Sequence, residues 1–192
     1  MQRLRSISDA ILVGVGTIIS DDPSLRVHWE LLGEPAGKTP IRVVIDGSGR
    51  APASARVLDG SLPTLIGTTE RATRRYPDHV QTIQAGQSSV DLSNLLEKLL
   101  RRGVGRVLVE GGAHVLASVL RGRLFDRLTV FVAPMVIGGA TAPSMVLGID
   151  PPSPGFPVPL ELTSLERLGN GSLLTYSPAT REFLGLSPAA VS

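Results

Sequence analysis

The stretch Val107–Leu116, which reads Val-Leu-Val-Glu-Gly-Gly-Ala-His-Val-Leu, decides the fold of this 192-residue chain. Its apolar, valine-rich start predicts a short buried strand at Arg106–Val109. Glu110 ends that strand, two glycines follow, and apolar residues then recur at helical spacing, so we expect a helix from about Gly112 or Ala113. A strand, a glycine turn and a helix amino terminus can cradle a phosphate, because the first N–H groups of a helix lack partners and its dipole favours an anion. An ordinary junction without a ligand fits these residues equally well, since they lack the GxGxxG fingerprint.

The rest of the chain continues the alternation of strands and helices. A helix is predicted at Asp91–Arg102, where five leucines form one apolar stripe between a capping aspartate and a closing glycine. Leu160–Leu168 and Ser172–Tyr176 alternate in polarity and flank Gly169-Asn170-Gly171, which predicts a hairpin. We therefore expect an α/β fold with a mainly parallel central sheet, helices on both faces and a C-terminal antiparallel hairpin. The other predicted strands are Ala10–Val15, Ile41–Asp46, Leu62–Gly67, Val80–Gln84 and Leu128–Ala133, and the end of a helix is predicted at Met1–Ser8.

Glycine turns follow three of the predicted strands. They lie at Gly14–Thr17, at Gly47–Gly49 and directly after Glu110. Thr17 offers a hydroxyl at the first turn, and Asp21 and Glu110 are carboxylates that end two different predicted strands. This set favours a nucleotide cofactor over hydrolysis, because the cofactor then carries the reaction and the protein supplies orientation.

Composition excludes several classes of function. The chain is 42% hydrophobic and 19% charged, with a formal charge of +2, and no basic run interleaved with aromatic residues indicates nucleic-acid binding. The absence of cysteine excludes disulfides, zinc-thiolate sites and a thiol nucleophile. No stretch approaches the roughly 20 apolar residues of a membrane helix. Glycines interrupt the apolar run that follows Arg3 and Arg5, and aspartates flank it on both sides, unlike a signal peptide. We expect a cytoplasmic protein of one domain at residues 1–178, with a loosely held tail at 179–192.

The remaining polar motifs carry little chemistry of their own. The histidines at positions 28, 79 and 114 lack metal-ligand spacing, so no metal site is predicted. Neither a GxSxG elbow nor a Walker lysine is present. A basic cluster of Arg71, Arg74 and Arg75 could meet a 2′-phosphate, although a solvated basic face is the commoner origin of such a cluster.

Four stretches together resemble one family. They are Ser8–Thr17 (SDAILVGVGT), Asp21–Leu25 (DDPSL), Val109–Gly112 (VEGG), and Ala133-Pro134 with Gly138-Gly139. The chain resembles the reductases of riboflavin biosynthesis, which have a dihydrofolate-reductase-like fold. In bacteria this domain is usually the C-terminal half of a deaminase–reductase. In archaea it stands alone as 2,5-diamino-6-ribosylamino-4(3H)-pyrimidinone 5′-phosphate reductase, and Val27-His28 and Gly139–Pro143 look more like that branch. The resemblance runs from about Arg3 to Tyr176.

The resemblance implies an NAD(P)H-dependent reduction of the ribosylamino side chain to ribitylamino. It places the substrate on four residues: Arg5 at its 5′-phosphate, Glu110 at its amino-pyrimidinone, and Leu25 and His28 along the site. It places the cofactor on Thr17, Asp21, Gly47, Gly111, Gly112, Ala113, His114 and Val115. Members of this family usually use NADPH and form homodimers, so the resemblance implies NADPH as the cofactor, with NADH possible, and a homodimeric protein.

Two departures from the family pattern stand out. The family normally begins with a strand and a Ser-Leu-Asp-Gly-Lys-like segment before the helix that carries Arg5, so the first family strand is expected to be missing here. Its absence should leave unpaired backbone groups inside the sheet. Gly47 stands where many relatives carry serine. A truncated, catalytically silent nucleotide-binding domain is therefore one alternative, and a pterin reductase of the same fold is another, although Arg5 and Glu110 favour the sugar-phosphate substrate.

Overall fold

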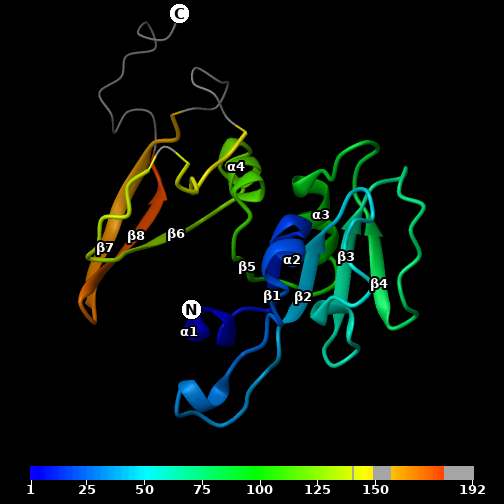
Figure 1. Ribbon diagram of the computed structural model, residues 1–192, viewed down its shortest axis with the longest axis horizontal. Helices are drawn as coiled ribbons and strands as arrows, with labels where there is room; N and C mark the ends of the chain where they lie inside the picture. The colour runs from blue at the N-terminus through cyan, green and yellow to red at the C-terminus, as the bar shows by residue number, and fades with distance from the viewer. Residues whose placement is uncertain (140, 149–156, 180–192) are drawn as a thin grey trace, which may run out of the picture. The chain divides into compact units, whose positions relative to one another are not determined.

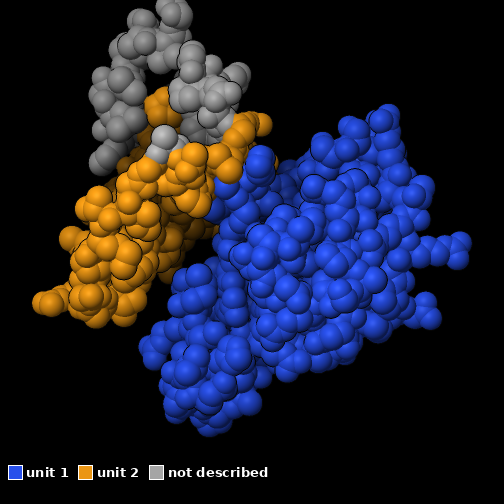
Figure 2. Space-filling view, viewed as in Figure 1, with its two compact units in different colours: residues 1–116 blue, residues 117–192 orange. Residues whose placement is uncertain are grey.

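A computed structural model gives the fold of the chain and describes residues 1–139, 141–148 and 157–179 (Figure 1). The chain divides into two compact units, which we treat separately. Unit 1 is Met1–Leu116, blue in Figure 2, and unit 2 is Ala117–Ser192, orange where it is described. This division does not test the expectation of one domain at residues 1–178, which stays a prediction. Of the expected tail at 179–192, only Ala179 is described, and its N–H donates to the carbonyl of Pro159 at 3.0 Å.

Unit 1 is built on a five-stranded parallel sheet with the order β4-β3-β2-β1-β5. Its strands are β1 (Ala10–Gly14), β2 (Ile41–Ile45), β3 (Thr64–Thr68), β4 (Val80–Gln84) and β5 (Val107–Val109). Every residue of β1 and β3 is buried, as expected of parallel strands covered on both faces. The predicted parallel sheet is confirmed, with each strand within two residues of its expected bounds.

Helices cover both faces of this sheet, as predicted. On one face, Ile18 of α2 (Val15–Asp21) joins a core cluster with Val44 and Ile66 of β2 and β3. Successive residues of a strand point to opposite faces, so Gly67 faces the other side. There, Leu95 of α3 (Leu92–Leu100) packs so closely that a β-carbon on Gly67 would lie 2.8 Å from its Cδ2 atom.

The smaller elements of unit 1 also follow from local sequence. The helix α3 is capped as predicted, since the Asp91 carboxylate accepts a hydrogen bond from the Asn94 N–H at 3.0 Å. A five-residue helix, α1 (Gln2–Ser6), precedes β1 and buries none of its residues. Two 3₁₀ turns, η1 (Trp29–Leu31) and η2 (Arg56–Leu58), lie in the connections before and after β2.

Unit 2 contains a three-stranded antiparallel sheet with the order β6-β8-β7. Its strands are β6 (Leu128–Val132), β7 (Leu160–Leu168) and β8 (Gly171–Pro178), and β7 and β8 form the predicted C-terminal hairpin. Gly169 has a φ of +63° in the turn, a backbone conformation that favours glycine. The helix α4 (Ala113–Arg121) begins in unit 1 and ends in unit 2. No helix within the described ranges has the length and apolar character needed to cross a membrane.

One local prediction was wrong. Residues Gly14–Thr17 were expected to form a glycine turn, but Gly14 caps α2 and the helix begins at Val15. A glycine in a helix costs up to about 1 kcal/mol relative to alanine. Burial of Val15 and Ile18 in the core outweighs that cost. As a result, Asp21 is the last residue of α2 rather than a residue at a strand end.

Candidate functional site

Three neighbouring strands bring the predicted site residues to one edge of the sheet in unit 1. β5, β1 and β2 are parallel neighbours, so their carboxyl ends meet at the same edge. Glu110 and the glycine pair follow β5, α2 follows β1, and Asp46 with Gly47 follows β2. The Glu110 N–H donates to the carbonyl of Leu12 at 3.0 Å, which extends the β5–β1 ladder by one residue. Open α/β sheets bind their ligands at this edge.

Glu110 is held by Arg5 in a two-point ion pair. The Nε of Arg5 donates to Oε1 of Glu110 at 2.6 Å, and its Nη2 donates to Oε2 at 2.5 Å. The side chains are only 13% and 6% exposed. Such a bidentate pair fixes both distance and orientation, so the carboxylate is presented in one defined position.

Polar contacts anchor α1, which carries Arg5. The Nη1 of Arg5 donates to the carbonyl of Arg26 at 2.7 Å, and the side-chain oxygen of Gln2 accepts from the His28 N–H at 2.9 Å. No residue of α1 is fully buried, so these contacts and the Arg5–Glu110 pair help to hold it in place. The segment after α2 and the end of β5 are thereby joined through one arginine.

The glycine turn after Glu110 packs against the start of α2. Gly111 and Gly112 have φ angles of +115° and +81°, a region that side chains disfavour. A β-carbon on Gly112 would lie 3.4 Å from the Thr17 hydroxyl, and one on Gly14 would lie 2.9 Å from Val115 Cγ2. The structure therefore brings together Thr17, Gly112 and Val115 of the predicted cofactor set. Ala113 and His114 form the first turn of α4, as expected for the phosphate cradle.

The turn after β2 is fixed by a buried carboxylate. Asp46 accepts the N–H groups of Arg50 and Ala51 and the hydroxyl of Tyr76, each at 2.8 Å. Burial, together with the hydrogen bond to Asp46, raises the pKa of the Tyr76 phenol. These bonds hold the turn that contains Gly47 in place.

Gly47 lies in a crowded place at that turn. Its carbonyl accepts the Thr69 hydroxyl at 2.7 Å, and a β-carbon would lie 3.3 Å from Thr69 Cγ2. A serine here would need its neighbours to shift by a few tenths of an ångström. The neighbouring Thr68 hydroxyl is buried and has no hydrogen-bond partner among the described residues.

Three other predicted site residues lie further from this arrangement. Leu25 is 2% exposed and belongs to the core cluster, so its side chain packs rather than lines a cavity. The half-exposed His28 ring bonds Glu30 at 2.8 Å through Nδ1. Asp21 is exposed at the end of α2, and no hydrogen bond or ion pair within the described residues joins it to Glu110.

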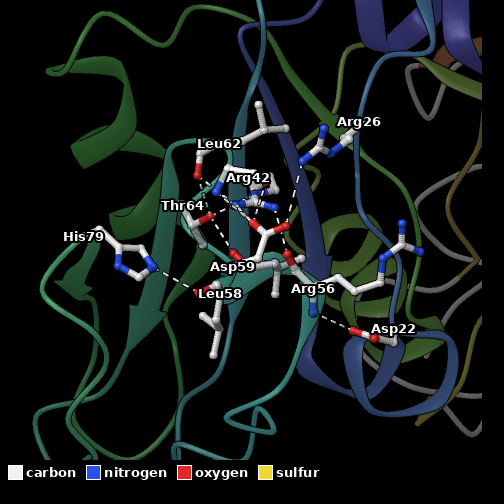
Figure 3. A network of polar contacts seen from close by, with 11 residues as sticks. Asp22, Arg26, Arg42, Arg56, Leu58, Asp59, Leu62, Thr64 and His79 are labelled. Carbon is white, nitrogen blue, oxygen red and sulfur yellow. Dashed lines mark hydrogen bonds and ion pairs between the residues drawn. The ribbon is translucent and has the colours of Figure 1, made fainter.

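Sequence reasoning missed a buried arginine near the amino end of β2, the end opposite Asp46 and Gly47. Arg42, the second residue of β2, has no exposed surface and donates to Thr64 Oγ1, to the carbonyls of Arg56 and Leu62, and to Asp59 (Figure 3). Burial lowers the pKa of Arg42, opposed by the Asp59 carboxylate. The pKa of Asp59 falls to about 2, chiefly through its hydrogen bonds from Ser61 and also through Arg42. The sequence did contain one signal for this buried arginine, because Arg42 is the single charged residue among the apolar residues Ile41–Ile45 of the predicted strand.

The basic cluster beyond β3 is only partly engaged. Arg74 donates to the carbonyl of Gly49 at 3.1 Å and lies over the Tyr76 ring, 5.3 Å from its centroid. Arg71 and Arg75 are exposed. Within the described part of the chain, no three His, Asp or Glu side chains gather as metal ligands.

A parallel sheet whose carboxyl edge carries a glycine turn, a helix amino terminus and a clamped carboxylate is typical of nucleotide-binding α/β domains. The RibD C-terminal domain family matches residues 1–174, and the chain belongs to that family. The family predicted from the sequence is thereby confirmed, as is the α/β fold class.

Named relatives agree with this assignment. The chain is 36% identical to the 2,5-diamino-6-ribosylamino-4(3H)-pyrimidinone 5′-phosphate reductase of Methanothermobacter thermautotrophicus, over 92% of this chain and 83% of that protein. It is 35% identical to the reductase of the same name from Archaeoglobus fulgidus, over 91% and 82%. It also matches the riboflavin biosynthesis protein RibD of Escherichia coli at 31% identity, over 72% of this chain but 40% of RibD.

Solved structures show the same fold. The deaminase–reductase of Thermotoga maritima superposes with a TM-score of 0.74 at 25% identity, covering 93% of this chain and 47% of that one. The yeast riboflavin biosynthesis reductase Rib7 gives a TM-score of 0.69 at 21% identity, covering 93% and 78%. At that identity, Rib7 supports the fold alone.

Proposed function

We propose that this chain is a reductase of riboflavin biosynthesis that converts the ribosylamino side chain of 2,5-diamino-6-ribosylamino-4(3H)-pyrimidinone 5′-phosphate to ribitylamino. The observation that carries this proposal is the similarity to two archaeal reductases of that name, each over more than nine-tenths of the chain. The ring-opened sugar imine takes a hydride at C1′ and a proton at its nitrogen, so one two-electron donor is consumed per turnover.

NADPH is the proposed donor, with NADH as the alternative. When bound, the nicotinamide would supply the hydride. The residues present fit a dinucleotide, because no atom lies within 4 Å of a β-carbon position on Gly111, and the backbone there is open to a bulky phosphate. Thr17, Asp21, Gly47 and the segment Gly111–Val115 would hold the cofactor, with the first turn of α4 directed at its pyrophosphate.

The substrate is assigned to Arg5, Leu25, His28 and Glu110. The guanidinium of Arg5 suits the 5′-phosphate, and the Glu110 carboxylate suits the N–H groups of the amino-pyrimidinone. Leu25 would contribute through its backbone, since its side chain belongs to the core. His28, half-exposed beside α1, would border the site. No residue is assigned to the proton transfer.

The proposed activity is tested by following NADPH oxidation at 340 nm with the enzymatically made substrate. Glu110→Gln should lower kcat/KM by about 10²-fold or more, because it removes a charged acceptor at the substrate ring. Glu97→Gln is the matched control, since Glu97 is exposed on α3 and, among the described residues, its carboxylate pairs only with Arg101. Turnover that is equal in both variants would refute the assignment of Glu110.

The alternatives predict different results in the same assay. A folded chain that binds NADPH but turns over no substrate would be the catalytically silent domain. NADPH oxidation with a dihydropterin and none with the sugar phosphate would identify a pterin reductase. The expected homodimer and the cytoplasmic location stay predictions, and sedimentation analysis of the purified chain tests the first.

A further inference from the structure

Two residues in the segment that follows α2 adopt a left-handed backbone conformation. Asp22, which ends the helix, has a φ of +40° and a ψ of +54°, and Leu25 has a φ of +51°. Aspartate tolerates this region, but a bulky branched side chain such as leucine is rarely found there. Strained backbone of this kind persists only where the surrounding contacts hold it, and it is enriched at functional sites.

The segment is anchored at its start and along its length. The Asp22 carboxylate accepts the Arg56 N–H at 2.8 Å, which ties the end of α2 to η2 (Figure 3). The Leu25 side chain is 2% exposed and belongs to the core cluster. The next residue, Arg26, extends its guanidinium to within 3.8 Å of the Asp59 carboxylate (Figure 3). Together these contacts hold the backbone between Asp22 and Arg26 in its strained conformation.

That conformation presents a backbone acceptor to Arg5. The Arg26 carbonyl accepts Nη1 of Arg5 at 2.7 Å, while Nε and Nη2 of the same guanidinium donate to Glu110. Because the guanidinium is planar, contacts on two of its edges fix its orientation as well as its position. Relaxation of Leu25 to a negative φ would move Arg26 and its carbonyl, and Arg5 would lose the contact that orients it from outside the ion pair.

We propose that Asp22 is a positioning residue for the substrate site and acts through Arg26 on Arg5. This inference rests on the proposed function, which assigns the substrate to Arg5 and Glu110. The Asp22 carboxylate holds the strained segment on η2, the segment directs the Arg26 carbonyl, and that carbonyl orients the Arg5 guanidinium. The preceding residue, Asp21, is assigned to the cofactor, so these two adjacent carboxylates act on different ligands.

Asp22→Gly isolates this role, because glycine adopts a φ of +40° without strain and the substitution removes only the anchoring carboxylate. In the assay of NADPH oxidation, the KM of the substrate should rise by about threefold to tenfold, the range of one lost hydrogen bond. The kcat and the KM of NADPH should stay within about twofold of wild type, because the weakened contact serves the bound substrate and its transition state alike. Asp22→Asn should restore the wild-type KM, since an amide oxygen also accepts the Arg56 N–H and asparagine tolerates the left-handed region.

Asp91→Gly is the matched control. It removes a carboxylate that also accepts one backbone N–H, that of Asn94 at 3.0 Å, in the cap of α3 on the other face of the sheet. This variant should lower Tm and leave the KM of the substrate unchanged. A structural defect alone therefore does not reproduce the effect expected of Asp22→Gly.

A second readout needs no turnover. The Nε–H of Arg5 donates to Glu110 at 2.6 Å and its side chain is 13% exposed, so its exchange with solvent is slowed and can be followed by ¹⁵N NMR. Arg5→Lys assigns the signal by removing it. Exchange should be faster by about threefold or more in Asp22→Gly and unchanged in Asp91→Gly.

Each outcome decides the proposal. It is overturned if the KM of the substrate and the exchange rate change no more in Asp22→Gly than in Asp91→Gly, or if Asp22→Asn does not restore them. An equal rise in the KM of NADPH also overturns it, because the effect would then lie on α2. Faster exchange in a chain that oxidises no NADPH would retain the action of Asp22 on Arg5 and reject the reductase. Turnover with unchanged exchange would do the reverse, and far-UV circular dichroism separates all of these results from unfolding.

Discussion

Replacing Arg42 with methionine should cost the chain much of its stability. The substitution keeps most of the stem of the side chain and removes the guanidinium, which donates at 2.8 Å to Thr64, at 3.0 Å to the Arg56 carbonyl and at 2.7 Å to the Leu62 carbonyl. Its fourth acceptor, Asp59, is 41% exposed and can be solvated instead, so that contact is discounted. An acceptor left without a partner in a buried place costs about 1–3 kcal/mol. Water will reach some of the three acceptors, so we expect a total loss of about 3–5 kcal/mol, in line with broken buried charge contacts.

Urea unfolding followed by far-UV circular dichroism measures this loss. In a chain of this size, about 2–4 °C of Tm accompany each kcal/mol, so Arg42→Met should also lower Tm by roughly 10 °C. Arg56→Met is the matched control, because Arg56 is exposed and contributes only its backbone to the network; it should stay within about 0.5 kcal/mol of wild type. A loss below about 1 kcal/mol in Arg42→Met, or a gain, would show that an apolar side chain fills the site as well as the ion does, and would refute the reasoning.

Other predictions test separate contacts. Lys38 and the N–H groups of Arg106 and Gly105 lower the pKa of Asp9 to about 2 from 3.8, so its contribution to stability is complete above about pH 4 and is lost as the pH falls toward 2. Asp9→Asn should flatten the dependence of the urea midpoint on pH in that window, and an unchanged slope would contradict the assignment. Gly67→Ala should destabilise the chain by about 1–3 kcal/mol, because its β-carbon would lie 2.8 Å from Leu95. Gly16→Ala in α2 meets no atom within 4 Å and should gain about 0.5–1 kcal/mol, so equal effects at the two glycines would exclude the packing argument. Asp91→Ala should cost about 1 kcal/mol through loss of the α3 cap, and no change in thermal unfolding would mean that the cap is replaced by solvent.

Local sequence patterns were sufficient to predict most of the secondary structure. Alternation, leucine spacing and glycine punctuation each act over a few residues, which is why the strands, α3 with its Asp91 cap and the β7–β8 hairpin were predictable. The start of α2 was not, because Gly16 and Thr17 disfavour a helix locally. Packing of Val15 and Ile18 in the core decides that segment, and such packing depends on residues distant in sequence.

The candidate site was predictable only in part. Glu110 and the glycine turn are adjacent in sequence, so their place at a strand end could be inferred from the chain itself. The partner of Glu110 could not, since Arg5 is 105 residues away and looks like an ordinary surface arginine. A local sequence pattern cannot predict that the Arg5 guanidinium and the Glu110 carboxylate form an ion pair. Asp46 was read only as the end of a strand, although its bonds to Arg50, Ala51 and Tyr76 fix the neighbouring turn.

The backbone around Leu25 connects the hydrogen-bond network of Arg42 to the Arg5–Glu110 pair. Leu25 has a φ of +51°, a conformation that costs a branched side chain roughly 1–2 kcal/mol, and its burial in the core offsets that cost. The segment is held from both sides, because Asp22 accepts the Arg56 N–H and Arg26 lies 3.8 Å from Asp59 (Figure 3). With its backbone fixed in this way, Arg26 presents the carbonyl that Arg5 binds. The role proposed for Leu25 at the substrate site would then act through the backbone turn that it maintains, which the Arg42 network also supports through Arg56 and Asp59.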